Sequence, residues 1–261
     1  MIELHSHVLP GLDDGTQNIP EALQLLTDYT NQGVTTIVCT PHLLPDTFSS
    51  AATLISWLDR RDQLITELSE AAIEHEIEVT LLAGAEVSLS TAIMPYLQQP
   101  ELATRFTLNK GSYILVELPH TLSGGLTTLE GLLFQIELSG YSPILAHPER
   151  AAHNPGVIST LKKWVESGRI LLQANAGHLV DDPRLDPNRR ERYRRRQKIT
   201  IELIRQDMIE FISSDAHDPV NRPCQHQLAY EKVARLFGKA TAERLLSENP
   251  ANVINDMALG G

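Results

Sequence analysis

Short apolar segments alternate with longer stretches of helical periodicity along most of the chain. The apolar segments are typical of buried β-strands and cover residues 1–7, 34–40, 77–83, 113–118, 143–146, 169–174 and 208–213. Between and after them, apolar residues recur at helical spacing, which predicts helices over 18–33, 50–74, 91–98, 127–139, 158–167, 188–205, 225–237 and 241–246. The pattern therefore predicts repeated β-strand and α-helix units.

Such alternation is typical of parallel strands joined by right-handed helical crossovers. Seven units favour a barrel, closed or nearly so, and the length of 261 residues suits a single α/β barrel domain spanning 1–261. A doubly wound open sheet is the alternative architecture. It is less favoured because the sequence shows neither a reversal of strand order nor a G-x-G-x-x-G loop.

Composition narrows the class of protein. Hydrophobic residues make up 42% and charged residues 21%, as in globular enzymes, and the formal net charge of −11 disfavours binding to nucleic acid or to an acidic membrane surface. No apolar stretch is long enough to insert into a membrane, and the first strand leaves no room for a signal peptide. The two cysteines show no paired spacing, so we expect a cytoplasmic protein.

The first strand carries two histidines in an H-x-H pattern. Strict alternation places Glu3, His5 and His7 on one face and Ile2 and Leu4 on the other, so the two imidazoles can converge on one cation. Taken alone, such a pair is more often found on the surface. The interpretation as a metal site depends on the ends of the other strands.

Potential metal ligands follow the other predicted strands. Because the carboxyl ends of parallel barrel strands meet at one rim, these side chains are expected to converge there. With Asp14 from the first loop, the nine candidate ligands are His5, His7, Asp14, His42, Glu86, Glu117, His147, Asp215 and His217. Asn175 and His178 follow the sixth strand, and we expect His178 to orient a ligand and not to bind metal itself.

The mixture of nitrogen and carboxylate ligands without cysteine favours Mn²⁺, Zn²⁺ or Fe²⁺. Nine ligands exceed the needs of one ion, so we infer two or three, with Glu86 as the bridging carboxylate. Two ions that share a hydroxide can promote in-line displacement at a phosphate ester. Arg150 and Arg222 follow His147 and His217 closely, and they are candidates to bind the phosphate oxygens, although each could instead pair with a surface carboxylate.

Several motifs resemble those of the polymerase and histidinol phosphatase (PHP) superfamily. They are His5-Ser6-His7, Thr40-Pro41-His42, His147-Pro148-Glu149-Arg150 and Ser214-Asp215-Ala216-His217. Four further segments resemble the bacterial manganese-dependent protein-tyrosine phosphatases of capsular and exopolysaccharide biosynthesis: Leu12-Asp13-Asp14-Gly15, Gly84-Ala85-Glu86, Val116-Glu117 and Gln173-Ala174-Asn175. The resemblance runs nearly from end to end.

This resemblance implies a distorted seven-stranded (β/α) barrel with three metal ions. By motif, one ion is held by His5, His7, Glu86 and Asp215, a second by Glu86, Glu117 and His147, and a third by Asp14, His42 and His217. It also implies that Arg150 and Arg222 orient the phosphate while a metal-bridging hydroxide attacks phosphorus in line. The implied substrate is the phosphotyrosine tail of a membrane-associated bacterial tyrosine kinase.

Other interpretations remain open at this stage. The alternatives are a small-molecule phosphatase of the histidinol-phosphate type, a metal-dependent amidohydrolase and a noncatalytic scaffold; the oligomeric state is left undetermined. The basic segment 189–198 predicts a solvated helix face or a docking surface for an acidic phosphorylated tail. We expect a buried, inert Cys39, assign His75, His153 and His226 to the surface, and leave the role of His120 undecided.

Overall fold

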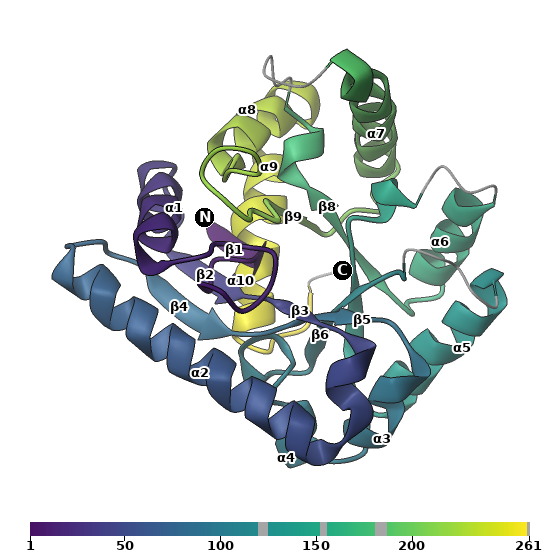
Figure 1. The fold of residues 1–261 in the computed structure, drawn as a ribbon. Helices are drawn as coiled ribbons and strands as arrows, with labels where there is room; N and C mark the ends of the chain where they lie inside the picture. The colour runs from purple at the N-terminus through teal and green to yellow at the C-terminus, as the bar shows by residue number, and fades with distance from the viewer. Residues whose placement is uncertain (120–124, 152–155, 181–186, 260–261) are drawn as a thin grey trace.

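The structure is a computed structural model and describes residues 1–119, 125–151, 156–180 and 187–259. Figure 1 shows the strands in the middle of the molecule with most of the helices around them. Among the described residues the strands are β1 (Ile2–Ser6), β2 (Thr36–Cys39), β3 (His42–Leu43), β4 (Thr80–Ala83), β5 (Glu86–Ser88), β6 (Tyr113–Glu117), β7 (Ser142–Ala146), β8 (Leu171–Asn175) and β9 (Phe211–Ser213). The α-helices are α1 (Ile19–Asn31), α2 (Ala51–Glu74), α3 (Met94–Leu97), α4 (Pro100–Ala103), α5 (Gly125–Leu138), α6 (Val157–Glu166), α7 (Pro187–Arg205), α8 (His226–Phe237), α9 (Lys239–Glu243) and α10 (Asn249–Ile254).

All strand pairs are parallel, in the orders β1-β2-β4 and β3-β5-β6-β7-β8-β9. The first strand also reaches the end of the last, because Asp215 N donates to His5 O at 2.9 Å and His7 N donates to Ala216 O at 2.9 Å. Neighbouring strands follow the order of the chain without a reversal. This confirms the parallel α/β barrel type and disfavours the doubly wound alternative.

Two of the predicted strands, 34–40 and 77–83, are each followed after a short break by a second strand that was not predicted, and these breaks separate the two sheets. Thr40 and Pro41 separate β2 from β3, and Gly84 and Ala85 separate β4 from β5. Proline lacks the N–H that would continue the ladder. A side chain at Gly84 would place its Cβ 2.7 Å from Val38 Cγ1, so glycine is needed for this close approach. His42 and Glu86 consequently begin short strands of their own at the rim.

The helices agree with the apolar periodicity, with differences mainly at their ends. At the start of α1, the Asn18 side chain accepts a hydrogen bond from Glu21 N at 3.0 Å, and proline occupies the first turn. The predicted helix 91–98 is instead a 3₁₀ turn followed by the short helix α3, and the predicted strand 77–83 begins only at Thr80. Local periodicity located these elements without fixing their ends.

An apolar cluster lies inside the ring of strands, beneath the rim that carries the candidate ligands. It combines residues of both sheets with the C-terminal helix α10: Leu4, Val38, Leu108, Tyr113, Leu115, Ile144, Ala146, Phe211 and Val253. A second, larger cluster packs the six-stranded sheet against its helices. The rim residues are therefore carried on strand ends that close packing holds in place.

One buried arginine connects α2 to the interruption between β4 and β5. The side chain of Arg61 is 1% exposed and donates hydrogen bonds to the carbonyl oxygens of Gly84 and Arg105 and to the Asp62 carboxylate. The Gly84 carbonyl lies two residues before Glu86. Arg61 therefore holds the backbone from which a candidate ligand projects.

We expect the substitution Arg61→Ala to lower the free energy of unfolding by about 3 kcal/mol, because it leaves buried carbonyl groups without donors. Urea unfolding followed by circular dichroism measures this change. Arg60→Ala is the matched control, because Arg60 is exposed and its ion pair with Glu67, at 3.5 Å, contributes little to stability. Equal stabilities of the two variants would contradict the assigned role of Arg61.

Candidate metal centre

The imidazoles of His5 and His7 face each other across a short gap, with their Nε2 atoms 3.2 Å apart. The register of β1 shifts between Glu3 and Ser6, so strict alternation does not hold. The prediction that Glu3 shares their face was wrong: the Tyr29 hydroxyl lies 3.2 Å from Glu3 Oε2 and 2.9 Å from Ser6 Oγ. The irregularity turns both histidines to one side and leaves Glu3 on the other.

The structure brings all nine predicted ligands together at the rim. Within each group their potential ligand atoms lie within 4.8 Å of one another, and the groups are His7, Asp14, His42 and His217; His5, Glu86 and His147; His5, His7 and Asp215; His42, Glu86 and Glu117. These groups differ in part from the sets implied by resemblance, since Glu86 is absent from the group of His5, His7 and Asp215 and lies instead with His5 and His147. Glu117 groups with His42 where His147 was expected, and His7 joins the group of Asp14.

Glu86 lies at the centre of the cluster and is fully buried. Its Oε1 is 2.8 Å from His147 Nε2, while its Oε2 is 2.9 Å from His42 Nδ1 and 3.2 Å from His5 Nε2. Burial raises the pKa of Glu86, but the surrounding imidazoles outweigh this effect and hold it well below its ordinary value. A carboxylate that faces several imidazoles with both oxygens is placed to bridge two cations.

Asp215 connects the imidazoles to the two predicted phosphate-binding arginines. Its Oδ1 is 3.4 Å from His7 Nε2, and its Oδ2 accepts hydrogen bonds from Arg150, from Arg222 at 2.9 Å and from Asn175 Nδ2 at 2.9 Å. Burial raises its pKa, but Arg150, His5 and Arg222 together hold the pKa well below its ordinary value. Asp215 is thus ionised and is shared by both halves of the site.

Two site residues have left-handed backbone conformations. The φ angles are 36° at His147 and 53° at Asp215, in a region of backbone conformation that residues other than glycine rarely adopt. His147 follows β7 directly and Asp215 follows β9 after one residue, where the chain turns at the rim. Such strain is retained where surrounding structure overdetermines it, and it is frequent at functional sites.

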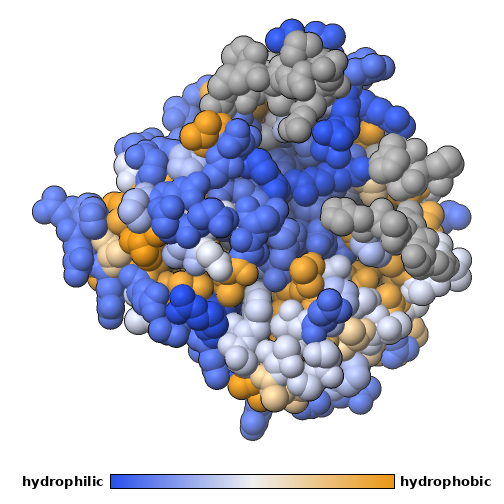
Figure 2. Space-filling model, viewed as in Figure 1, coloured by the Kyte–Doolittle hydropathy of each residue, from blue (hydrophilic) through white to orange (hydrophobic). Residues whose placement is uncertain are grey.

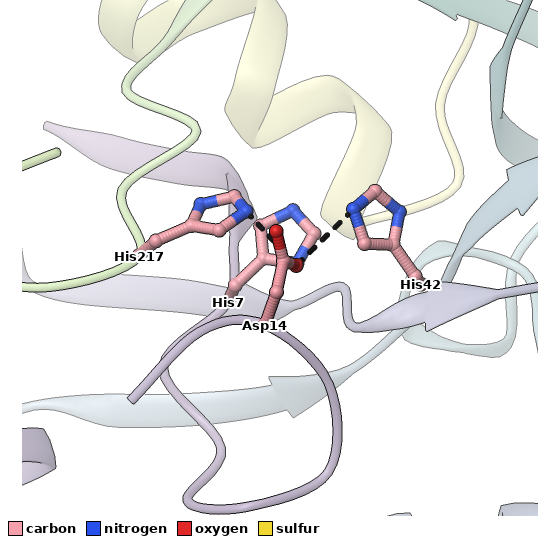
Figure 3. A group of neighbouring side chains, drawn as sticks. All are labelled: His7, Asp14, His42 and His217. Atoms are coloured by element: carbon pink, nitrogen blue, oxygen red, sulfur yellow. Dashed lines mark ion pairs between the residues drawn. The ribbon is translucent and has the colours of Figure 1, made fainter. Parts of the chain in front are cut away.

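The outer part of the cluster is formed by four residues: one just after β1, one in the first loop, one in β3 and one in the segment after β9. Figure 3 shows the Asp14 carboxylate between the imidazoles of His42 and His217, beside His7. Asp14 Oδ1 is 3.4 Å from His42 Nε2 and 3.3 Å from His217 Nε2. The close approach of the His217 imidazole is the main reason that the pKa of Asp14 is lowered. This group is the most accessible part of the centre, because the Asp14 side chain is 64% exposed.

Several ligand histidines are oriented through their second nitrogen. His5 Nδ1 is 2.8 Å from Gln173 Oε1, and His7 Nδ1 is 2.6 Å from Asp13 Oδ2. Asp13 also accepts hydrogen bonds from His42 N and Gly15 N. Such partners fix the ring so that the other nitrogen can bind a metal. Asp13 is a functional residue that residue spacing did not identify, although the doubled aspartate of Leu12-Asp13-Asp14-Gly15 was a signal for it.

The donor set suits divalent cations. Among the described residues, His42 Nδ1, Glu86 Oε2 and His217 Nε2 are buried without a hydrogen bond of good geometry, although they lie close to other ligand atoms. Burial and the neighbouring Arg150 lower the pKa of His147 to about 4, so its imidazole is neutral, as a metal ligand must be. Burial and the nearby Glu86 raise the pKa of Glu117 to about 7. A cation would satisfy these atoms and relieve the repulsion between the carboxylates.

The remaining histidines occupy different environments. His178 Nδ1 is 2.7 Å from Glu149 Oε1, and Glu149 also accepts a hydrogen bond from Asn175 N, so His178 is separated from Asp215 by intervening residues. The surface assignment of His226 was wrong: it is 0% exposed, and its Nδ1 is 3.4 Å from Glu3 Oε2. His75 is exposed as expected, whereas His120 and His153 lie outside the described residues.

We expect Gly15→Ala to weaken Mn²⁺ binding about 10- to 100-fold, because the loop that carries Asp13 and Asp14 must move. A Cβ at Gly15 would lie 2.0 Å from the His7 carbonyl oxygen, which is too close for any local adjustment. Titration calorimetry measures the affinity. Gly131→Ala in α5 is the control, since its Cβ meets nothing within 4 Å. Unchanged binding in the Gly15 variant would contradict the assigned role of this loop.

Comparison with known proteins agrees with the motifs. The chain is 27% identical to the tyrosine-protein phosphatase CpsB of Streptococcus pneumoniae over 259 residues, covering 99% of this chain and 100% of that protein. It is 24% identical to the tyrosine-protein phosphatase YwqE of Bacillus subtilis over 262 residues, covering 99% of this chain and 93% of that protein. A solved structure also matches this chain. It is one of the crystal structures of YwqE from Bacillus subtilis and CpsB from Streptococcus pneumoniae, which are described as metal-dependent tyrosine phosphatases. The match has a TM-score of 0.78 and 26% identity, and it covers 100% of this chain and 96% of the other.

The family model for capsular polysaccharide synthesis, CpsB/CapC, matches residues 1–255. This confirms the resemblance seen in the motifs at the strand ends. Because the match spans nearly the whole sequence, this chain belongs to the CpsB/CapC family of capsular polysaccharide synthesis.

Proposed function

We propose that this chain is a metal-dependent protein-tyrosine phosphatase that acts in the synthesis of a bacterial capsule or exopolysaccharide. The observation that carries the proposal is the position of Asp215. One of its oxygens faces the imidazole cluster and the other is held by Arg150 and Arg222, so a cation site and an anion site adjoin. Metal-assisted hydrolysis of a phosphate ester uses a cation site to activate water and an anion site to bind the phosphate oxygens.

The nine clustered residues would hold two or three divalent cations, for which we propose Mn²⁺, with Zn²⁺ or Fe²⁺ as alternatives compatible with the same ligands. When bound, such ions activate water and neutralise phosphate charge. Arg150 and Arg222 would bind the phosphate oxygens, because a planar guanidinium can offer two parallel N–H donors. Their contact with Asp215 holds both arginines beside the cluster.

A cysteine nucleophile is not needed, and the structure disfavours one. Cys39 and Cys224 are both buried, and burial raises the pKa of the Cys39 thiol to about 12. A buried, protonated thiol is unreactive. Tyrosinate has a conjugate acid of pKa about 10, so it can leave with only modest proton assistance.

The substrate we propose is phosphotyrosine on the tail of a bacterial tyrosine kinase of the capsule system. The relatives named as tyrosine-protein phosphatases and the family's link to capsular polysaccharide synthesis support this choice. A kinase uses ATP, which places such a substrate in the cytoplasm, and the free thiols of both cysteines are compatible with a reducing compartment. Among the described helices, none combines the length and apolar character needed to cross a bilayer.

The test is phosphate release from a tyrosine-phosphorylated kinase tail. Parallel assays on histidinol phosphate and on a cyclic amide distinguish the two other enzyme classes considered from the sequence. We expect turnover of the phosphotyrosine substrate to exceed that of histidinol phosphate, with no cleavage of the amide. A higher turnover of histidinol phosphate would indicate a small-molecule phosphatase and contradict the proposed substrate. Inactivity of the metal-bound protein on all three substrates would favour a noncatalytic scaffold.

Removal of metal with a chelator should abolish phosphate release, and added Mn²⁺ should restore it, because all nine candidate ligands lie in one cluster. Metal analysis before and after treatment, together with the activity, checks this expectation. Circular dichroism controls for loss of fold. A fully metal-free protein that keeps its activity would contradict the proposed mechanism.

We expect Arg150→Ala to reduce kcat/KM about 100- to 1,000-fold, the usual cost of losing a donor to the charge that develops in the transition state. Arg150→Lys should recover only part of the loss, because lysine lacks the paired donors. Bound Mn²⁺ should stay constant in both variants. If metal content fell in parallel with activity, Arg150 would be acting by holding Asp215 and not by binding phosphate. Arg169→Ala, which removes an arginine that pairs with Glu130, is the control.

A further inference from the structure

The basic helix α7 lies against the two short turns that border the candidate site. Arg196 Nη1 is 3.3 Å from His178 Nε2, and the ring of Tyr193 meets the His178 ring edge-on with centroids 5.3 Å apart. Gln197 Nε2 donates to Leu179 O at 3.1 Å. His178 belongs to the turn after β8, which directly follows Asn175. One face of α7 is thus fixed beside residues that contact Asp215.

The next part of the helix surface is strongly cationic and exposed. Residues 189–198 contain six arginines and one lysine against a single glutamate, in a chain whose formal net charge is −11. Five of these cations have exposed side chains: Arg190 and a group of four, Arg192, Arg194, Arg195 and Lys198. Within the part of the chain that the structure describes, none of these four forms an ion pair with a carboxylate. Among the described residues, the charge of these four side chains is therefore not neutralised by ion pairs.

The positive charge extends from the site to this surface. Burial, Arg150 and Arg192 all lower the pKa of the Arg196 guanidinium, which means that Arg150 and Arg192 each lie close enough to Arg196 to repel it. An anion bound across them would relieve that repulsion. In Figure 2, deep blue hydrophilic residues border a hollow at the centre of this face and continue toward the upper right, where Figure 1 places α7.

We infer that the exposed face of α7, defined by Arg192, Arg195 and the adjoining Arg196, docks an acidic segment of the substrate polypeptide next to its phosphotyrosine. This inference rests on the proposed function and adds to it a reason for selecting a protein over a small aryl phosphate. Charge complementarity at such a surface mainly increases the rate of productive encounter and lowers KM. An anionic membrane is a poorer occupant, because its extended charged surface would also face the rest of the acidic chain, whereas a short peptide segment can contact the basic face alone.

The test compares the variant Arg192→Glu/Arg195→Glu with the wild-type protein on three substrates. These are a phosphotyrosine peptide with Asp and Glu on both sides, the same peptide with Asn and Gln instead, and para-nitrophenyl phosphate. We expect KM for the acidic peptide to rise about tenfold with kcat unchanged, because the two substitutions replace attraction by repulsion at the docking surface. A tenfold rise corresponds to a loss of about 1.4 kcal/mol of binding free energy. KM for the other two substrates should change little. The difference should shrink at high salt.

Lys162→Glu/Lys163→Glu on α6 is the matched control, because it changes the net charge equally at two exposed lysines away from α7. An equal rise of KM in this control, or no rise in the α7 variant, would overturn the docking inference while phosphatase activity itself stands. Inactivity of the wild-type protein on all three substrates would instead refute the proposed function. Sedimentation with phosphatidylserine vesicles completes the test. Binding that the α7 substitutions abolish, with KM for the acidic peptide unchanged, would assign the surface to a membrane.

Discussion

The buried carboxylate of Asp215 is the interaction on which the rest of the candidate site depends. It stands where the first and last strands of the barrel meet, and its own backbone N–H bonds to His5 O. Its two oxygens face different partners, imidazoles on one side and the guanidinium groups of Arg150 and Arg222 on the other. A buried anion is costly unless it is paired and hydrogen-bonded. Asp215 meets that condition from both directions, and it thereby connects the proposed cation site to the proposed phosphate site.

The residues behind the site explain how so many charged groups can be kept in fixed positions. Gln173 and Asp13 orient His5 and His7 through their second nitrogens, and Arg61 holds the Gly84 carbonyl near Glu86. On the outer side of β1, Glu3 accepts hydrogen bonds from His5 N and Ser214 N, residues adjoining or belonging to the candidate ligands. Some of these hydrogen bonds join residues far apart in the sequence, such as His5 with Gln173, and others join residues of one tight turn, such as His7 with Asp13. The apolar cluster beneath the rim supplies the rigid support.

The helix α7 beside the candidate site differs from it in exposure and in charge. Most of the cluster of carboxylates and imidazoles is buried, whereas the face of α7 is exposed and carries a local positive charge on an acidic molecule. The first environment suits tightly held cations, and the second suits a weak, salt-sensitive contact with a polypeptide. His178, placed between Glu149 and Arg196, joins the two regions through direct contacts. Recognition of the substrate chain and chemistry at its phosphate can therefore be separated by experiment.

The sequence alone determined the repeated strand and helix units and the types of side chain at the strand ends, because apolar periodicity and residue chemistry are local properties. It therefore located all nine candidate ligands and both arginines, which the structure brings to one rim. Only the tertiary structure decided that Glu3 turns away from His5 and His7, that His226 is buried, and that Glu117 lies with His42. These outcomes depend on a register shift in one strand and on contacts between distant segments, such as Glu3 with Ser214, which residue spacing does not encode.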